Sequence, residues 1–385
     1  SAISKLKVYK NRLAIITCCA HLYVWNLGEG VEKMKKKIDP ESYHSEVVIE
    51  GGHINKRDFH IRDYANINEL GYLGPSFHMG FTKNQILYVS RNPHLMKVGY
   101  PDFDGICENT TFILETKNEN ILRNDLIPFI MHSDNFIEQS VSNVRGGVNP
   151  YVNWGDLASI EFSLPPNEKQ AEIAELLWSL DGVTQKQIKV LEKLKCLQKV
   201  KFNDLLSAAT GEMKPLSKFL KQKKRKSKTP HKENRYIGLE HIKSGEIQCT
   251  DYSDSKEIKA QCSIVEIGDL CLSKLRPYLD KAFIATFDAV STSELLIYDT
   301  DKLSKEYILY NFHSQNFINY VSRMSYGTRM PRVSSQIIGN YHIKEIKNED
   351  ALLHKMRELE ILIEASKAQQ QSSTSLQKSL INKIF

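Results

Sequence analysis

Three residues in the N-terminal half have the spacing of a magnesium-dependent nuclease. Asp102 follows Pro101, and Glu115 and Lys117 follow further along the chain. Two carboxylates that hold Mg²⁺ beside a lysine that assists the attacking water would hydrolyse a phosphodiester. The same residues also fit a strand over residues 112–115, with Glu115 and Lys117 at its solvated end. The pattern is short and degenerate, which favours the strand.

A strongly basic run lies in the middle of the chain. Residues 221–228 carry six positive charges in eight positions, among them Lys223, Lys224, Arg225 and Lys226. Such a run binds phosphates and releases their counterions when the partner is a nucleic acid. The alternatives are a solvated loop or a nuclear targeting signal.

Further basic and aromatic residues gather in short segments rich in glycine and proline. Arginine pairs bidentately with guanine, and asparagine with adenine, in the major groove of DNA. The alternative is a tight turn in which only glycine and proline matter, or, for the third segment, a strand end. The candidate DNA contacts are Arg145, Asn149 and Tyr151, then Tyr326, Arg329 and Arg332, and finally Lys274, Arg276 and Tyr278.

The elements that position these residues occur twice. The segment His132-Ser-Asp-Asn-Phe136 returns 181 residues later as His313-Ser-Gln-Asn-Phe317, and Gly146 and Pro150 match Gly327 and Pro331 at the same offset. The chain therefore contains two copies of one unit. A protein with two like halves suits a ligand that also repeats, and duplex DNA is such a ligand. Repetition of the two histidines favours packing, and we assign them no metal or catalytic role.

Each copy ends in a long helical stretch. Leu164-Pro-Pro-Asn-Glu-Lys-Gln170 is a helix start with Asn167 as N-cap, and apolar residues then recur at spacings of three and four. The second stretch has a polar middle, residues 369–375, which is either frayed or part of a continuous helix. The residues predicted to pack the helices or to bind partners are Ile173, Leu176, Leu180, Val183, Leu194 and Leu197, then Met356, Leu359, Ile363 and Leu380; Val190 continues the first stripe.

The predicted fold is mixed α/β, with two similar domains separated by two long, antiparallel, coiled-coil-like helices and related by a pseudo-two-fold internal repeat. Short β-like runs between turns rich in Gly, Pro and Asn support the α/β domains. We expect α/β domains over residues 1–163 and 211–345, and helices over residues 164–210 and 346–385.

Composition narrows the class of protein. Hydrophobic residues make up 41% of the chain, and no apolar run is long enough to span a bilayer. The seven cysteines form no C-x-x-C pair, so a reducing cytoplasm is expected. The chain contains neither a P-loop nor an amino-methyltransferase motif, and we expect no cofactor and no metal.

Taken together, these motifs resemble the specificity (S) subunits of type I restriction–modification systems. The match rests on Leu164-Pro-Pro-x-Glu-x-Gln170 opening a long helix, on Tyr236-Ile-Gly-Leu-Glu-His-Ile242, and on Ser273-Lys-Leu-Arg-Pro-Tyr278. The second helix departs from the pattern, because it begins Lys344-Glu-Ile-Lys-Asn-Glu349. The resemblance implies a non-catalytic subunit whose two target recognition domains each bind one half of a split double-stranded DNA site.

The resemblance also implies partners. Two methyltransferase (modification) subunits would dock on the helices, which would set the gap between the half-sites, and ATP-dependent restriction subunits would join them. A non-enzymatic scaffold whose helices bind only protein is the alternative.

Overall fold

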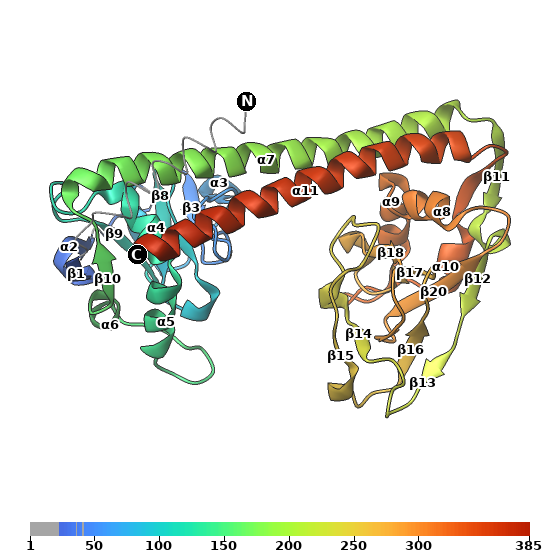
Figure 1. Cartoon of the computed structure of the whole chain (residues 1–385), viewed down its shortest axis with the longest axis horizontal. Helices are drawn as coiled ribbons and strands as arrows, with labels where there is room; N and C mark the ends of the chain where they lie inside the picture. Colours follow the sequence, from blue (N-terminus) through green and yellow to red (C-terminus); the bar gives the residue numbers. More distant parts are fainter. Residues whose placement is uncertain (1–22, 36, 41) are drawn as a thin grey trace. The chain divides into compact units, whose positions relative to one another are not determined.

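The computed structural model describes residues 23–385 except residues 36 and 41. The chain divides into two compact units: Ser1–Ile188 with Ala368–Phe385, and Lys189–Lys367. Each unit combines an α/β domain with part of each of two long helices (Figure 1).

The first unit contains three small sheets. Two strands form an antiparallel pair, and the other eight form two four-stranded sheets. In sheet order, the strands are β1 (Tyr23–Asn26) with β10 (Glu161–Leu164); β2 (Val31–Lys33), β9 (Thr111–Thr116), β6 (Ile86–Val89) and β7 (Val98–Gly99); and β4 (Ala65–Asn66), β3 (Val47–Ile49), β8 (Gly105–Glu108) and β5 (Phe77–Phe81). The short helices are α2 (Leu27–Gly30), α3 (Ile67–Leu70), η1 (Pro93–Leu95), η2 (Asn124–Leu126), α4 (Ile127–Met131), α5 (Asp134–Ser142) and α6 (Trp154–Ala158).

The second unit has the same plan, and its strand β13 lies where the described residues of the first unit form the isolated bridge between Lys37 and Met79. Its strands in sheet order are β11 (Gly211–Pro215) with β21 (His342–Ile346); β12 (Leu220–Lys223), β20 (Leu295–Thr300), β17 (Leu270–Ser273) and β18 (Ala282–Ile284); and β13 (Lys226–Ser227), β16 (Cys262–Val265), β19 (Ala289–Ser291), β14 (Arg235–Ile237) and β15 (Ser253–Asp254). The short helices are η3 (Leu216–Lys218), η4 (Leu239–His241), η5 (Ser255–Glu257), η6 (Pro277–Leu279), α8 (Lys305–Phe312), α9 (Gln315–Met324) and α10 (Ser335–Asn340).

The two units therefore share one topology. In each unit a single parallel strand pair, β3 with β8 and β14 with β19, stands among antiparallel pairs. The mixed α/β fold and the internal repeat that the sequence predicts are confirmed. The repeated His-Ser-x-Asn-Phe segment has a structural role, because Ser133 and Ser314 cap α5 and α9 by accepting a hydrogen bond from the backbone N–H of a buried phenylalanine.

Both long helices are present. Helix α7 spans Asn167–Ala208 and helix α11 spans Asp350–Ile384, so the polar middle of the second stretch is helical rather than frayed. The starts fall a few residues after the predicted ones, since Pro165 and Pro166 precede α7 and strand β21 ends at Ile346.

Each unit packs opposite ends of the two helices into its main core. In the first unit Ile173, Leu176 and Leu180 of α7 share a core with Leu380 of α11. In the second unit Phe202 near the end of α7 shares a core with residues near the start of α11, and Gln198 donates a hydrogen bond to Glu360 at 2.6 Å. Within each unit the helices therefore run antiparallel.

The predicted apolar stripe is wrong in the middle of α7. Val183, Val190 and Leu197 are 45%, 51% and 49% exposed and do not pack the helices, whereas Thr184 is buried. An α-helix has 3.6 residues per turn, so a strict seven-residue repeat drifts by about 20° per heptad and the buried face moves one position along the chain. Met356 and Ile363 are buried as predicted, while Leu194 and Leu359 are half-buried.

Candidate nucleic-acid interface

In the first unit, the candidates Arg145, Asn149 and Tyr151 lie on a closed loop between α5 and α6 (Figure 1). Backbone hydrogen bonds of 2.8 and 2.9 Å join Arg145 and Tyr151 and close the loop. Gly146 takes a positive φ of 84°, which favours glycine. The loop is bound to the connection after β6, because the N–H of Asn92 donates to the carbonyl of Pro150 at 2.7 Å.

The second unit builds the same loop between α9 and α10. Tyr326 and Arg332 close it through backbone bonds of 3.0 and 2.9 Å, and Gly327 has a φ of 94°. The N–H of Arg276, after β17, donates to the carbonyl of Pro331 at 2.7 Å. The two segments that the sequence nominated separately, residues 274–278 and 326–332, are therefore adjacent.

We name these two matching features the paired-loop surfaces. They comprise residues 90–97 with residues 145–151 in the first unit, and residues 274–281 with residues 326–332 in the second. Tyr278 and Tyr326 are 52% and 59% exposed, and Arg276 and Arg329 are also exposed. Exposed tyrosines and arginines on a rigid turn have the chemistry to stack on bases and to pair with their edges.

Two of the candidate arginines already form ion pairs with carboxylates. Arg145 lies 2.8 Å from Asp156, and Arg332 makes two contacts of 3.1 and 3.2 Å with Glu294. The hydrogen bonds that both guanidinium groups donate to these carboxylates raise the pKa of each arginine. These ion pairs hold Arg145 and Arg332 against their own units, whereas Arg276 and Arg329 form no ion pair with a described residue. Lys274 is half-buried beneath the loop.

Sequence reasoning missed Arg91 in the first unit. It is exposed, bridges to Tyr151, and places its guanidinium 5.8 Å from the centre of the Tyr151 ring. The signal was available, because Pro93-His-Leu95 in the first copy matches Pro277-Tyr-Leu279 in the second, and both begin a one-turn 3-10 helix. The residues before the two prolines also share a left-handed backbone.

Polar contacts that include buried side chains anchor each α/β domain to the α7 residues of its own unit. In the second unit His313 Nδ1 lies 2.6 Å from Asp280, whose other oxygen is 3.5 Å from Lys199 of α7. In the first unit His60 Nε2 lies 2.9 Å from Asp181 of α7. Because Asp280 directly follows η6, this contact connects a paired-loop surface to the long helix of the same unit.

The basic run is not a solvated loop. It forms strands β12 and β13 in two different sheets. Three of its six cations are ion-paired: Lys221 with Asp301, Lys223 with Asp269, and Arg225 with Glu266. The Arg225 hydrogen bond lowers the pKa of Glu266 to about 2.

The cations that remain available in this run are Lys224, Lys226 and Lys228. All three are exposed, and none forms an ion pair with a described residue. Lys226 donates a hydrogen bond to Ser263 at 2.8 Å.

The first unit carries a counterpart that sequence reasoning missed. Lys37 bridges to Met79 of β5, at the position where Lys226 pairs with Ser263 of β16. Lys35 and Lys37 are exposed, and Lys33 lies 3.8 Å from the centre of the Phe112 ring. Burial, followed by the nearby Lys35, lowers the pKa of Lys33. Both units therefore present basic residues at the same place in the fold.

Two of the three residues of the nuclease-like pattern, Glu115 and Lys117, are engaged in other contacts. Glu115 accepts a hydrogen bond from Gln85 at 2.7 Å, and Lys117 donates to the carbonyl of Gly28. Asp102 is exposed. The described residues contain no cluster of three or more metal-binding side chains. In the same part of the chain, no helix is long and apolar enough to cross a membrane.

Comparison with known proteins agrees with this organisation. Residues 33–193 match the family model described as type I restriction modification DNA specificity domain. The type I restriction enzyme MjaVIII specificity subunit of Methanocaldococcus jannaschii is 23% identical over 317 residues, which cover 73% of each chain. The EcoDI specificity subunit of Escherichia coli is 23% identical over 242 residues, 52% of this chain and 54% of that protein.

Solved structures share the fold. The S subunit of the type I restriction-modification system from M. genitalium matches with a TM-score of 0.50 at 13% identity and covers 96% of this chain and 97% of its own. A chain from a study of complex assembly and conformational transition of the type I R-M system matches with a TM-score of 0.51 at 15% identity, covering 94% and 97%.

A chain that builds one exposed loop pair twice on duplicated α/β domains presents two matching surfaces. More narrowly, the family model over residues 33–193 and the relatives make the chain similar to the specificity subunits of type I restriction–modification systems.

Proposed function

We propose that this chain is the DNA sequence-recognition subunit of a type I restriction–modification complex. Each unit would bind one half of a bipartite duplex target through its paired-loop surface. The observation that carries the proposal is the duplication of this surface, with the same closed loop bound to the same connection in both units. The basic positions that both units share would contact phosphates and set affinity without specifying sequence.

The recognition domains in this proposal are residues 1–163 and 211–345, and the spacer helices are residues 164–210 and 346–385. The chain itself carries out no chemistry. Two methyltransferase subunits would dock on the outward faces of the helices, where Val183, Val190 and Leu197 are exposed, and ATP-dependent restriction subunits would join them. We place the complex in the cytoplasm, because the five described cysteines are all free.

Binding to mixed-sequence duplex DNA at two salt concentrations tests the proposal. A protein that contacts six phosphates should lose roughly a thousandfold in affinity between 50 and 200 mM salt, because each contact releases condensed counterions. An affinity that is absent or independent of salt would instead support a scaffold whose helices bind only protein.

A further inference from the structure

The first unit fills the space between its α/β domain and α7 with aromatic rings. Trp178 of α7 packs against Phe59, Tyr100 and Phe129, with ring centroids 5.4, 5.4 and 4.9 Å from its own. The indole N–H of Trp178 donates to the carbonyl of Asp125 at 3.0 Å. This region belongs to a continuous hydrophobic core.

The second unit has smaller or polar residues at the equivalent positions. The N–H of Tyr100 donates to the carbonyl of Phe59, and in the second unit the N–H of Ile284 donates in the same way to the carbonyl of Ile247. The 181-residue offset that pairs His132 with His313 also pairs Phe129 with Tyr310, and Asp125 with Glu306.

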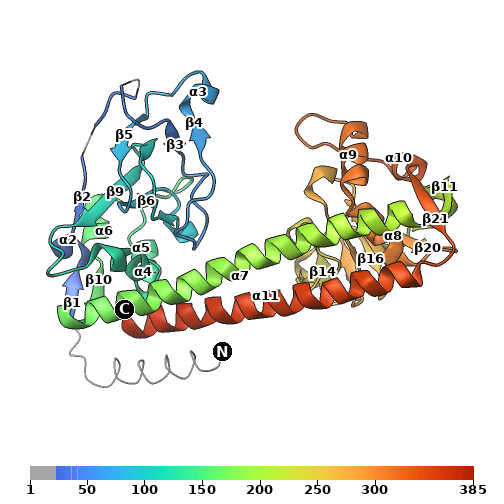
Figure 2. The same ribbon diagram turned by 90° about the horizontal axis from the view of Figure 1, so that it is seen from above.

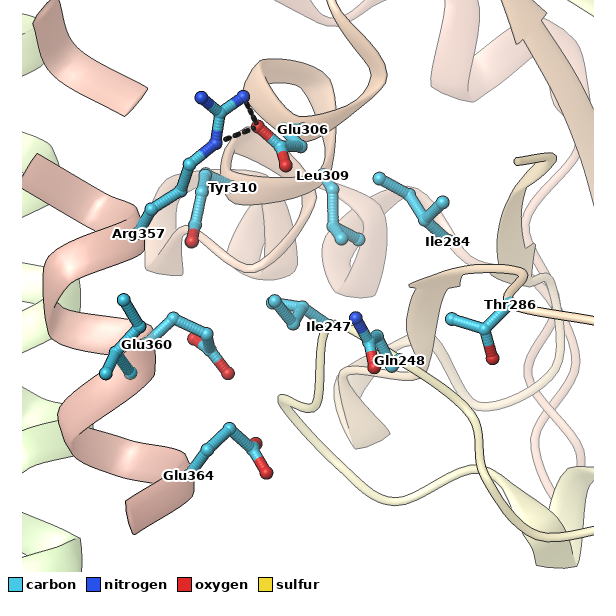
Figure 3. Close-up of a pocket in the computed structure, with 11 residues that line it drawn as sticks. Ile247, Gln248, Ile284, Thr286, Glu306, Leu309, Tyr310, Arg357, Glu360 and Glu364 are labelled. Atoms are coloured by element: carbon cyan, nitrogen blue, oxygen red, sulfur yellow. Dashed lines mark hydrogen bonds and ion pairs between the residues drawn. The ribbon is translucent and has the colours of Figure 1, made fainter. Parts of the chain in front are cut away.

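The residue at the position of Trp178 is Arg357. Trp178 follows the fully buried Leu177, and Arg357 follows the fully buried Met356. Arg357 donates a hydrogen bond to the side-chain carboxylate of Glu306, and Trp178 donates one to the main-chain carbonyl of Asp125, the residue that matches Glu306. Figure 3 shows that the Arg357 side chain lies beside Glu306 at the edge of the space, which leaves the centre open.

The result is a cavity of about 430 Å³ within the second unit. This volume is within the range of cavities that bind small ligands or single side chains. Its walls include Ile247, Ile284, Leu309 and Tyr310, which are apolar or aromatic. The repeat itself therefore indicates the kind of group that fits here, because a flat aromatic ring occupies the matching space in the first unit.

The rim of the cavity is acidic. Glu306, Glu360 and Glu364 line it together with Arg357, which binds Glu306. Glu364 is ion-paired with Lys367 at 2.7 Å, and Glu360 accepts a hydrogen bond from the uncharged Gln198 at 2.6 Å, so Glu360 is the acid of this rim that forms no ion pair with a described residue. Burial raises the pKa of Glu360, so a nearby cation would stabilise its charged form. The apolar wall continues outward along α11, where Ile361 is 68% exposed. A segment of polypeptide is long enough to cover both the cavity and the apolar surface along α11, whereas a free small molecule would fill the cavity only.

We propose that this cavity is a docking site for a partner protein that inserts an aromatic side chain flanked by a basic residue. The aromatic ring takes the place that the indole of Trp178 holds in the first unit, and the basic residue meets the carboxylate of Glu360. The proposal rests on assembly with partner subunits and is independent of DNA reading by the paired-loop surfaces.

Short peptides test the chemistry on the full-length chain. In isothermal titration the tripeptide Lys-Trp-Lys should bind about tenfold more tightly than Lys-Ala-Lys, because a buried aromatic anchor carries most of the binding energy at such sites. It should also bind more tightly than Glu-Trp-Glu, which the acidic rim repels. Equal affinities for Lys-Trp-Lys and Lys-Ala-Lys would overturn the proposal.

Two substitutions at one position test the location. Arg357→Trp places in the second unit the residue that fills the space in the first, and should weaken binding of Lys-Trp-Lys by about tenfold or more. Arg357→Ala removes the same cation but leaves the space open, and should bind at least as well as the native chain. Equal peptide affinities of the two variants would exclude the cavity as the site.

DNA affinity serves as the independent control. It should be the same for the native chain and for both variants, since Arg357 is outside the paired-loop surfaces. A native chain that does not bind DNA but still discriminates among the peptides would overturn the proposed function and leave the docking site intact.

Discussion

The basic run offers a sharp test, because the structure separates its cations into two kinds. Lys224 and Lys226 are exposed and form no ion pair with a described residue, whereas Lys223 is paired with Asp269, which is 1% exposed. The double variant Lys224→Ala/Lys226→Ala removes two surface charges and breaks no ion pair with a described residue. The single variant Lys223→Ala leaves a buried carboxylate without its cation.

The double variant should therefore lose DNA affinity, whereas Lys223→Ala should lose thermal stability. Each lost phosphate contact lowers the slope of log affinity against log salt by about 0.9, so the double variant should lower it by about 1.8. The 1 M salt concentration is the reference at which the native chain and the variant bind alike. At 0.1 M salt the variant should then bind roughly eightfold more weakly than the native chain for each lost contact. Removing one partner of a buried ion pair costs about 3 kcal/mol, which should lower the melting temperature of Lys223→Ala by roughly 10 °C.

Salt-dependent binding to several unrelated duplexes and thermal melting measure these effects. The double variant should lose affinity about equally for all sequences and melt like the native chain. Lys35→Ala/Lys37→Ala in the first unit is the matched variant and should show the same change of slope. An unchanged slope in both double variants would refute phosphate contact at these positions.

Three further predictions follow from the repeat and the packing. Replacing Ser133 or Ser314 with Ala should cost about 1 kcal/mol of unfolding free energy in each case, measured by urea denaturation, because each removes a helix N-cap and neither side chain is at a paired-loop surface. A thiol reagent followed by peptide mass mapping should modify the exposed Cys196 in the native chain, while Cys107, whose pKa burial raises to about 12, should react only on unfolding. If the helices set the spacing of the target, four residues inserted after Gln187 and in the matching turn of α11 add about 6 Å. The gap between the half-sites should then grow by one or two base pairs, read from the modified adenines, with the half-site bases unchanged.

The parts of the fold that depend on local pattern were predictable from the sequence. The repeat, the α/β domains and both helices follow from turn residues, capping residues and apolar periodicity. The sequence did not correctly predict which positions of α7 are buried. A seven-residue repeat that starts on the buried face at Ile173 has moved off that face at Leu197.

Tertiary pairing limited the prediction of the site. Glycine and proline in the aligned segments indicated turns, but only the backbone bond between Arg276 and Pro331 brings two distant segments into one surface. The basic run was visible as charge, whereas its neutralisation by Asp269 and Glu266 depends on long-range contacts. The cavity beside Arg357 was not predictable from either copy alone, because it arises where Ile247, Ile284 and Arg357 stand at positions that carry aromatic rings in the first unit.

The central claim is that the two paired-loop surfaces each recognise one half of a divided DNA target. The most direct test is to co-express the chain with a methyltransferase subunit of a type I system and to map the methylated adenines in host DNA by sequencing. We predict two half-sites separated by a fixed gap, with Arg276→Ala/Arg329→Ala relaxing one half-site and Arg91→Ala/Asn149→Ala relaxing only the other. An undivided target, or variants that alter both halves alike, would contradict the account.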